Sequence, residues 1–272
     1  MFQRIADDNG GNRASGSSGF DASLAYVADR LEVAGYRVQR HSFVHDGGAG
    51  TNLVAELPGT DPTRVVMLGA HLDSTATGPG INDNGSGVAT VLTIAEALSQ
   101  LGAAEATIQF AFWDAEESGQ DGSNAYVASL GGDQLARLDA YLNLDIIGSP
   151  NFVRFVYREP TAALGSAAIT ELFAAHFAGQ GLAWEPIDLS GKTDHAAFPD
   201  PGVPTGGLFS GGTEPKTDAQ AAAFGGTAGV PADPCIHRAC DTIGSINDVI
   251  LGQMADAAAH VLLTLAAGAG SG

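Results

Sequence analysis

The stretch Val65–Gly87, VVMLGAHLDSTATGPGINDNGSG, decides the fold that we predict for this chain. It opens with a run of apolar β-formers, which is typical of a strand buried on both faces. His71 and Asp73 follow two residues apart, a glycine-rich loop carries Asp83, and an apolar-periodic helix begins near Gly85. A strand, a polar loop and a helix in this order favour an open α/β sheet, in which ligands bind beyond the carboxyl ends of the strands.

The rest of the chain alternates strand and helix patterns. The periodicities predict helices over residues 20–34, 85–101, 123–130, 161–178 and 246–267, and strands over residues 36–45, 51–57, 65–70, 107–113, 140–147, 153–157 and 203–209. This alternation predicts a single three-layer α/β/α domain over residues 1–272, with a mixed, mostly parallel central sheet and no inserted accessory domain. Residues 184–234 are rich in Gly, Pro, Thr and Asp, and we expect them to be mainly irregular.

Composition narrows the classes of protein that this chain can be. Of its 272 residues, 44% are hydrophobic, and 31 acidic residues against 12 basic ones give a formal net charge of −19. Nucleic acids and anionic membranes are bound by basic surfaces, so we expect neither as a partner. No stretch reaches the roughly 18 apolar residues that a membrane span needs. The first twenty residues lack an apolar core, so we expect no signal peptide in this sequence.

Cys235 and Cys240 are the two cysteines, and they lie five residues apart in PCIHRACD. They could form a disulfide in an oxidising compartment or contribute a pair of zinc ligands. We favour the disulfide because the chain has no further cysteine.

Acidic residues and histidines follow several of the predicted strands. They are His71 and Asp73 after 65–70, Glu116 and Glu117 after 107–113, Asp145 in 140–147, Asp83 in the glycine-rich loop, and His237 between the cysteines. Because the carboxyl ends of adjacent parallel strands meet at one edge of a sheet, we expect these side chains to converge. Oxygen and imidazole ligands suit zinc, manganese or cobalt in a catalytic setting. Two histidines and three carboxylates match two ions that share a carboxylate and a water.

Five ordered motifs carry a resemblance to a known family. They are GAHLDS, GINDNGSG, WDAEESG, NLDIIGSP and CIHRACD, and together they extend over most of the chain. In this order they resemble the secreted bacterial co-catalytic di-zinc aminopeptidases of the leucine-preferring type. The resemblance implies a secreted metalloprotease with two Zn²⁺ per chain that removes large hydrophobic residues from the free N-termini of peptides or proteins. We expect it to be a monomer.

The resemblance also assigns metal ligands. Asp83 would bridge both zinc ions. His71 and Asp145 would complete the shell of one ion, and Glu117 and His237 that of the other.

Glu116 and Asp73 would act beside the metals. By resemblance, Glu116 is the general base that takes a proton from the zinc-bridging water and returns it to the leaving amine. Asp73 would hold the imidazole of His71 in the tautomer that binds metal. If the backbone is extended at the two glutamates, neighbouring side chains point in opposite directions, so Glu117 can reach metal while Glu116 stays free for proton transfer.

An apolar substrate pocket is the last feature that the resemblance implies. Its positions here are Ile146, Gly191, Phe209 and Ile236, and Lys192 would also bind the substrate. Ile236 stands where several members carry a Tyr whose hydroxyl supports the oxyanion, and it has no donor. Lys192 stands where close relatives carry Arg, so it offers a point charge without the planar fork.

Other functions remain open on the same motifs. A dipeptidase, carboxypeptidase, amidohydrolase or glutaminyl cyclase would share the metal ligands and differ in the pocket. A non-enzymatic metal-binding module is a third possibility, although such modules usually lack ligands. Among the remaining polar residues, we interpret His195 as a structural histidine and Asp114 as a solvated acid.

Overall fold

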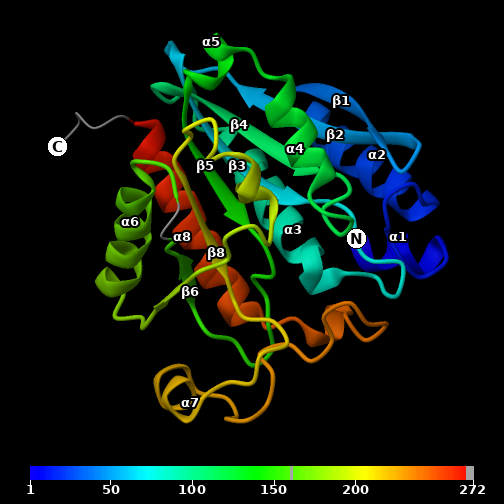
Figure 1. Ribbon diagram of the computed structural model, residues 1–272, viewed down its shortest axis with the longest axis vertical. Coiled ribbons are helices and arrows are strands. Elements are labelled where there is room, and N and C mark those ends of the chain that lie inside the picture. Colours follow the sequence, from blue (N-terminus) through cyan, green and yellow to red (C-terminus); the bar gives the residue numbers. More distant parts are fainter. Residues whose placement is uncertain (160–161, 268–272) are drawn as a thin grey trace.

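The computed structural model describes residues 1–159 and 162–267. Within these residues one mixed sheet of eight strands runs through the molecule in the order β1-β2-β4-β3-β5-β8-β6-β7 (Figure 1). The strands are β1 (Arg37–His45), β2 (Gly48–Leu57), β3 (Asp61–His71), β4 (Ala106–Trp113), β5 (Leu138–Leu144), β6 (Phe155–Tyr157), β7 (Glu185–Ile187) and β8 (Thr205–Phe209). The helices are α1 (Phe2–Asp8), α2 (Ser18–Val33), α3 (Ser86–Leu98), α4 (Asp121–Ser129), α5 (Gly132–Leu135), α6 (Ser166–Gly179), α7 (Asp218–Phe224) and α8 (Asp248–Ala266), with short helical turns at Ile81–Gly85, Asp194–Ala197 and Ile243–Ser245.

The pairing of the strands confirms the predicted mixed, mostly parallel sheet. β3 lies between β4 and β5 and is parallel to both, and β5 is parallel to β8. The predicted hairpin of residues 36–57 is the antiparallel pair β1–β2, which continues the sheet through β4. The predicted helix 161–178 begins at a residue outside the described part of the chain, and α6 begins at Ser166.

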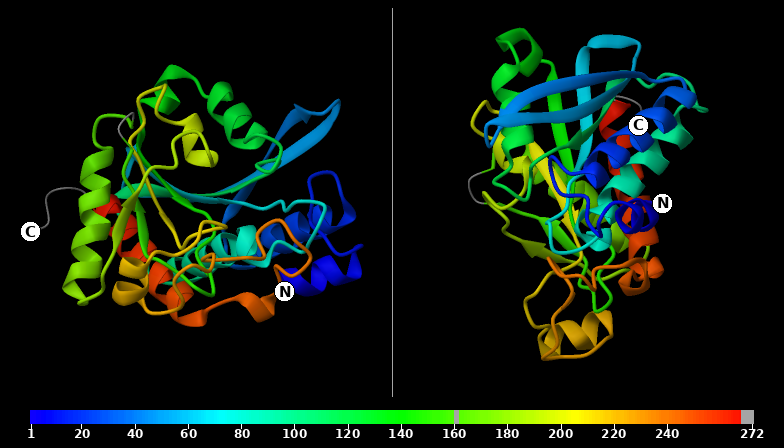
Figure 2. Two further views of the ribbon diagram at one scale, coloured as in Figure 1. Left: turned by 60° about the horizontal axis from the view of Figure 1, so that its bottom comes forward. Right: turned by 90° about the vertical axis from the view of Figure 1, so that its right-hand side faces the viewer.

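Alternating side chains on the central strands bury two cores, one on each face of the sheet. Leu68 of β3 and Phe110 of β4 face the larger core, which α2, α3, α6 and α8 cover. Met67 and Trp113 face the smaller core, which is closed by α4 and by Phe198. Because neighbouring residues of a strand point to opposite faces, this alternation produces the three layers that Figure 2 shows from the side.

The closing helix α8 is long and apolar enough, by length and composition alone, to span a membrane. The sequence reading did not anticipate such a segment. Ile250, Met254, Val261 and Leu262 of α8 are fully buried in the larger core. We therefore interpret α8 as a core helix of this α/β fold.

The order of strands brings the site residues to one edge of the sheet. The carboxyl ends of β3, β4 and β5 are neighbours, because β3 pairs with both of the others. The loops that leave these three ends carry the polar residues that the sequence singled out, except His237, which lies between α7 and α8. The segment 184–234, expected to be irregular, also contains β7 and α7, two elements too short to leave a periodic pattern.

Candidate dinuclear metal centre and adjoining cavity

Two groups of potential metal ligands share one carboxylate. His71, Asp83 and Asp145 form one group, and Asp83, Glu117 and His237 form the other, with ligand atoms within 4.8 Å of one another in each. Asp83 Oδ1 lies 3.2 Å from His71 Nε2, whereas Asp83 Oδ2 lies 3.0 Å from His237 Nε2. The two oxygens of Asp83 therefore face two different histidines.

The distances from the other two carboxylates to the histidines are similar to those from Asp83. Asp145 Oδ1 is 3.3 Å from His71 Nε2, and Glu117 Oε2 is 3.0 Å from His237 Nε2. Tetrahedral zinc with bonds of about 2.0–2.1 Å keeps neighbouring ligand atoms about 3.3 Å apart. The described side chains thus already have the spacing of two zinc shells joined at Asp83. We call His71, Asp83, Glu117, Asp145 and His237 the candidate metal centre.

The turn that carries Asp83 is held by another acid from far along the chain. Asp241 accepts hydrogen bonds from the backbone N–H groups of Asn82 (2.7 Å) and Asp83 (3.0 Å). Burial raises the pKa of Asp241 to about 7, although the two backbone hydrogen bonds act in the opposite direction. Asp241 follows directly on Cys240, so the segment that carries His237 also fixes Asp83.

Several residues of the site have left-handed backbone angles that glycine would normally supply. Ala115 (φ 58°) precedes Glu116, Ile146 (φ 52°) follows Asp145, and His237 itself has φ 58°. Such angles are uncommon for residues with a Cβ, and for β-branched Ile they are outliers that the surrounding structure must enforce. Strain of this kind gathers at functional sites, which agrees with the location of the candidate metal centre.

Asp73 connects β3 to the two adjacent glutamates. Its carboxylate oxygens accept the backbone N–H groups of Glu116 and Glu117, each at 3.2 Å. His71 Nδ1 lies 3.2 Å from the carbonyl oxygen of Asp73 and 3.4 Å from its Oδ1. Asp73 can therefore orient the His71 ring as expected, with its backbone carbonyl as an additional acceptor.

Glu116 and Glu117 do separate, but not for the reason that the sequence suggested. β4 ends at Trp113, and the glutamates lie in a turn closed by a hydrogen bond from Gly119 N to Glu116 O (2.9 Å). The extended backbone assumed from the sequence is therefore wrong. The turn directs Glu117 to His237, whereas Glu116 Oε2 stays 4.0 Å from His71 Nε2 and belongs to neither ligand group.

The electrostatics of the site place positive charge on the histidines. Hydrogen bonds to Asp83 and Glu117 raise the pKa of His237 to about 10. Burial lowers the pKa of His71, but the carboxylates of Asp145 and Glu116 outweigh it and hold that pKa well above its usual value. Burial raises the pKa of Asp83, yet the hydrogen bonds from both histidines leave it well below the usual range. The site thus attracts cations, and protons occupy it where metal ions do not.

The pKa of Glu116 is shifted in the opposite direction from that of Asp83. Burial raises its pKa to about 9; the nearby charge of His71 works against this shift, and the carboxylates of Asp194, Asp145 and Asp73 add to it. A carboxyl group with a raised proton affinity close to potential metal ligands is suited to accept and return a proton.

The predicted disulfide between Cys235 and Cys240 is present. It closes the loop that carries His237, whose side chain is 56% exposed, in contrast to the 1% of His71. The loop is also fixed by Asp233, which accepts from Cys235 N (2.7 Å) and from Asn82 Nδ2 (2.6 Å).

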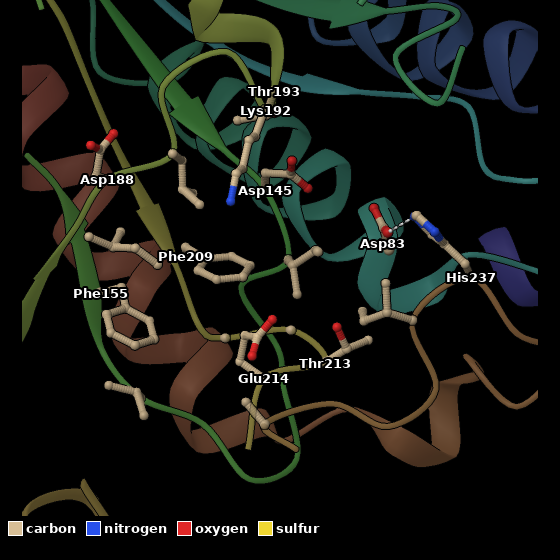
Figure 3. A pocket seen from close by; sticks show the side chains of 18 of the residues that line it. Asp83, Asp145, Phe155, Asp188, Lys192, Thr193, Phe209, Thr213, Glu214 and His237 are labelled. Atoms are coloured by element: carbon tan, nitrogen blue, oxygen red, sulfur yellow. Dashed lines mark ion pairs between the residues drawn. The ribbon is translucent and has the colours of Figure 1, made fainter. Parts of the chain in front are cut away.

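A cavity of about 650 Å³ adjoins the candidate metal centre. In Figure 3, Asp83, Asp145 and His237 lie toward one side of it, Phe155 and Phe209 toward the other. The cavity has a mainly apolar wall, formed by Ile146, Val153, Phe155, Ile187, Leu189, Phe209, Ala232 and Ile236.

Four of the five residues that the resemblance assigned to substrate binding line this cavity: Ile146, Lys192, Phe209 and Ile236. Gly191 does not, because it lies in an exposed turn with open space where a Cβ would be. The sequence reading missed Val153, Phe155, Ile187, Leu189 and Ala232. It placed Val153 and Phe155 on a strand, but nothing in the pattern indicated that this short strand ends beside a cavity.

Of the two polar residues that the sequence left outside the site, Asp114 differs from the expectation, whereas His195 agrees with it. Asp114 is buried rather than solvated, and it accepts a hydrogen bond from Thr51 N (2.8 Å). Burial raises its pKa to about 6. His195 is outside both ligand groups, and its Nε2 lies 2.5 Å from Glu159 Oε1. Asp114 follows a strand just as the site acids do, so its position alone could not distinguish it.

The α/β fold with a shared carboxylate between two ligand groups defines a protein with a candidate two-metal site at the edge of its sheet. Residues 52–262 match the model of Peptidase family M28, and the chain belongs to that family. This bears out the family resemblance seen in the sequence.

Three similar proteins illustrate the match. Leupeptin-inactivating enzyme 1 of Streptomyces exfoliatus is 45% identical over 271 residues, which cover 98% of this chain and 60% of that protein. The aminopeptidase from Aneurinibacillus sp. strain AM-1 superposes with a TM-score of 0.65 at 26% identity, over 79% of this chain and 47% of that one. A glutaminyl cyclase of Porphyromonas gingivalis has a TM-score of 0.75 at 22% identity, over 97% and 95% of the two chains. The chain thus spans about half to three-fifths of the length of the first two.

Proposed function

We propose that this protein is a zinc-dependent aminopeptidase that removes hydrophobic N-terminal residues from peptides. The observation that carries the proposal is the position of Asp83, whose two oxygens each lie within 3.2 Å of a different histidine. A single carboxylate between two histidines is the arrangement that a pair of metal ions with a common ligand requires. Membership of Peptidase family M28 and the similarity to proteins named aminopeptidase support the reaction class.

The ligands in this proposal are those expected from the sequence. His71 and Asp145 would hold one Zn²⁺, Glu117 and His237 would hold the other, and Asp83, which belongs to both groups, would be the common ligand. When bound, the two ions supply a polarised scissile carbonyl and a water of lowered pKa. Asp73 keeps the His71 ring oriented and fixes the turn of the two glutamates through their N–H groups.

Glu116 is the proton carrier in this proposal. Its Oε1 accepts a hydrogen bond from Gln120 Nε2 (3.2 Å), which leaves Oε2 on the side of His71. Oε2 takes a proton from the attacking water and returns it to the nitrogen of the leaving amine. The raised proton affinity of Glu116 favours the first transfer, and the transfer of that proton to the leaving amine returns Glu116 to its ionised form for the next cycle.

The cavity supplies the preference for the first residue. Ile146, Phe209 and Ile236 line it beside the ligands, so a Leu, Met or Phe side chain can be desolvated there. Lys192 points into the same space (Figure 3) and offers a positive charge to a substrate carbonyl or carboxylate. Ile236 has no donor, so in this chain the oxyanion depends on the metal ions rather than on a hydroxyl group at that position.

A glutaminyl cyclase is the second candidate, because such an enzyme shares this fold over nearly its full length. That similarity extends to the fold alone. The two activities differ in what they need from the N-terminus: an aminopeptidase cleaves the bond after it, whereas a cyclase closes an N-terminal glutamine with loss of ammonia.

The test compares both reactions on the zinc-loaded protein. We expect release of p-nitroaniline from leucine p-nitroanilide, no release from its N-acetyl derivative, and no cyclisation of a peptide that begins with glutamine. Glu116→Gln should keep two zinc ions per chain and lower kcat by about 10²–10⁴-fold. Glu171→Gln, an exposed substitution on α6, is the matched control and should retain activity. Cyclisation without cleavage would overturn the proposal.

We also propose that the protein is secreted and monomeric. The disulfide supports an oxidising compartment. Activity found in the medium of the producing cells, and a sedimentation mass near 27.5 kDa, are the expected results.

A further inference from the structure

Arg13 is a buried arginine close to the candidate metal centre that the proposed reaction does not use. It lies in the loop between α1 and α2, and its side chain is completely buried. Within the described chain its guanidinium donates to three backbone carbonyls: those of Leu72, of Pro79 (2.9 Å) and of Gly80 (2.7 Å). All the side-chain hydrogen bonds of Arg13 in the described chain thus go to the backbone of residues 72–80.

These three carbonyls belong to the two segments that carry metal ligands. Leu72 lies between His71 and Asp73 at the end of β3, and Pro79 and Gly80 form the turn that leads to Asp83. Arg13 therefore ties the strand end to the turn of the shared carboxylate. The backbone N–H of Arg13 donates to Ser74 Oγ (2.9 Å), which adds a fourth connection to the same region.

The turn leaves little room for movement around this guanidinium. Gly80 has φ 61°, and a Cβ there would lie 2.4 Å from the carbonyl oxygen of Asp83 and 2.4 Å from Ser74 Cβ. The chain is therefore packed closely at the point where Arg13 binds it. A glycine in this position permits both the left-handed angle and the close approach.

The charge of Arg13 also acts on the site. Burial lowers its pKa to about 10, while the carboxylates of Asp73, Asp241, Asp83 and Glu117 act in the opposite direction, so it remains protonated at neutral pH. A buried charge is costly unless it is well solvated by hydrogen bonds, and here carbonyls rather than an ion pair supply them. Of these acids, Asp83 belongs to both ligand groups of the candidate metal centre and Glu117 to the group of His237.

We propose that Arg13 is a positioning residue for the metal centre: it fixes Asp83 relative to His71, and its loss weakens zinc binding through the shared carboxylate. The inference rests on the proposed metal centre but not on the peptidase activity. Lysine cannot replace Arg13, because one ammonium group cannot span three carbonyls in the geometry that the planar fork reaches.

The test measures zinc itself. Zinc dissociation constants are determined by competition with a chromophoric chelator for the wild type, Arg13→Lys and Arg154→Lys, together with the thermal unfolding of each metal-free protein. Arg154 is the matched control: it is also buried, it also lies over a phenylalanine ring, and it donates to Gln253 of α8. We expect Arg13→Lys to weaken zinc binding by about 10–100-fold. Arg154→Lys should lower the unfolding temperature and leave both zinc constants unchanged.

Unchanged zinc constants in Arg13→Lys would overturn the proposal, as would an equal loss in Arg154→Lys, since both results assign Arg13 a purely structural role. If Arg13→Lys does not fold, Ser74→Ala removes the acceptor of the Arg13 N–H and keeps the guanidinium. We expect Ser74→Ala to weaken zinc binding several-fold. Zinc dissociation constants equal to those of the wild type would contradict the proposal. A wild type that binds two zinc ions without cleaving peptides would refute the proposed activity and leave this inference intact.

Discussion

His71 and His237 lie on opposite sides of Asp83, yet the structure supports them in different ways. His71 ends a central strand, is 1% exposed and is oriented by Asp73. His237 is 56% exposed and lies in a loop that a disulfide closes. A ligand on a rigid buried strand loses little entropy when it binds metal, whereas a ligand on an exposed loop loses more. We therefore expect the ion between His71 and Asp145 to bind more tightly than the other.

Among the changes that test the difference between the two zinc ions, we expect the removal of each histidine to have the largest effect. His71→Ala should abolish binding of the tight ion and destabilise the metal-free protein, because the buried acids Asp83 and Asp145 lose their nearest positive group. His237→Ala should weaken only the second ion, by more than about 100-fold, and should lower the unfolding temperature of the metal-free protein less than His71→Ala does, because the His237 side chain is 56% exposed. Zinc counted per chain by atomic absorption, with thermal unfolding in chelator, checks both. Equal losses of zinc and of stability in the two variants would show that the two ligand groups are equivalent.

A lower pH should increase the difference between the affinities of the two zinc ions. In the metal-free site both histidines have a raised pKa, about 10 for His237, so each must release a proton to bind zinc. Affinity therefore falls about tenfold per pH unit for each proton released, and between pH 8 and pH 6 the second zinc should weaken about 100-fold.

The stability of the metal-free protein should change with pH in the opposite direction. A raised histidine pKa contributes stability that is fully present below the unfolded value of 6.5 and is lost as the pH rises through about 10. Zinc titrations and thermal unfolding across this range test both slopes. A zinc affinity that does not depend on pH would contradict the protonation of the empty site.

Reduction of the disulfide should have the smallest effect. Without the Cys235–Cys240 bond, the His237 loop is still held by Asp233 and Asp241, so we expect about a tenfold loss of affinity for the second zinc and none for the first. The double variant Cys235→Ser and Cys240→Ser provides the measurement without reductant. A loss of both ions would mean that the loop supports the whole site.

The convergence of His71, Asp83, Glu117 and Asp145 could be expected from the sequence because these residues follow apolar strands, whereas the role of each residue, and that of His237, came from the family resemblance. The pattern around Val65–Gly87 predicted the central strand, and the parallel order of β3, β4 and β5 explains why acids distant in sequence come together. The separation of Glu116 from Glu117 was expected for the wrong reason, since a turn and not an extended strand produces it. Sequence periodicity describes regular elements and carries no information on such turns.

The roles of residues that form hydrogen bonds to the backbone of the site could not be predicted from the sequence. Arg13 stands in a stretch with loop composition, and only the folded chain reveals that its partners are carbonyls around position 80. Asp241 looks like any acid after a cysteine until the amides of the Asp83 turn are seen beside it. Short elements such as α7 were missed for a related reason: seven residues give too few turns for a periodicity.

The cavity and the candidate ligands come from different stretches of chain. Most of the apolar wall belongs to residues 146–155, 187–189 and 209–236, whereas the ligands stand on the β3, β4 and β5 ends and at His237. Substitutions at Val153, Phe155, Ile187 and Leu189 therefore change the wall without touching a candidate ligand, whereas Ile146 and Ile236 directly adjoin Asp145 and His237. Exchange of residues 153–155 and 187–189 alone is thus the way to alter the shape of the cavity while the candidate metal centre keeps its supports.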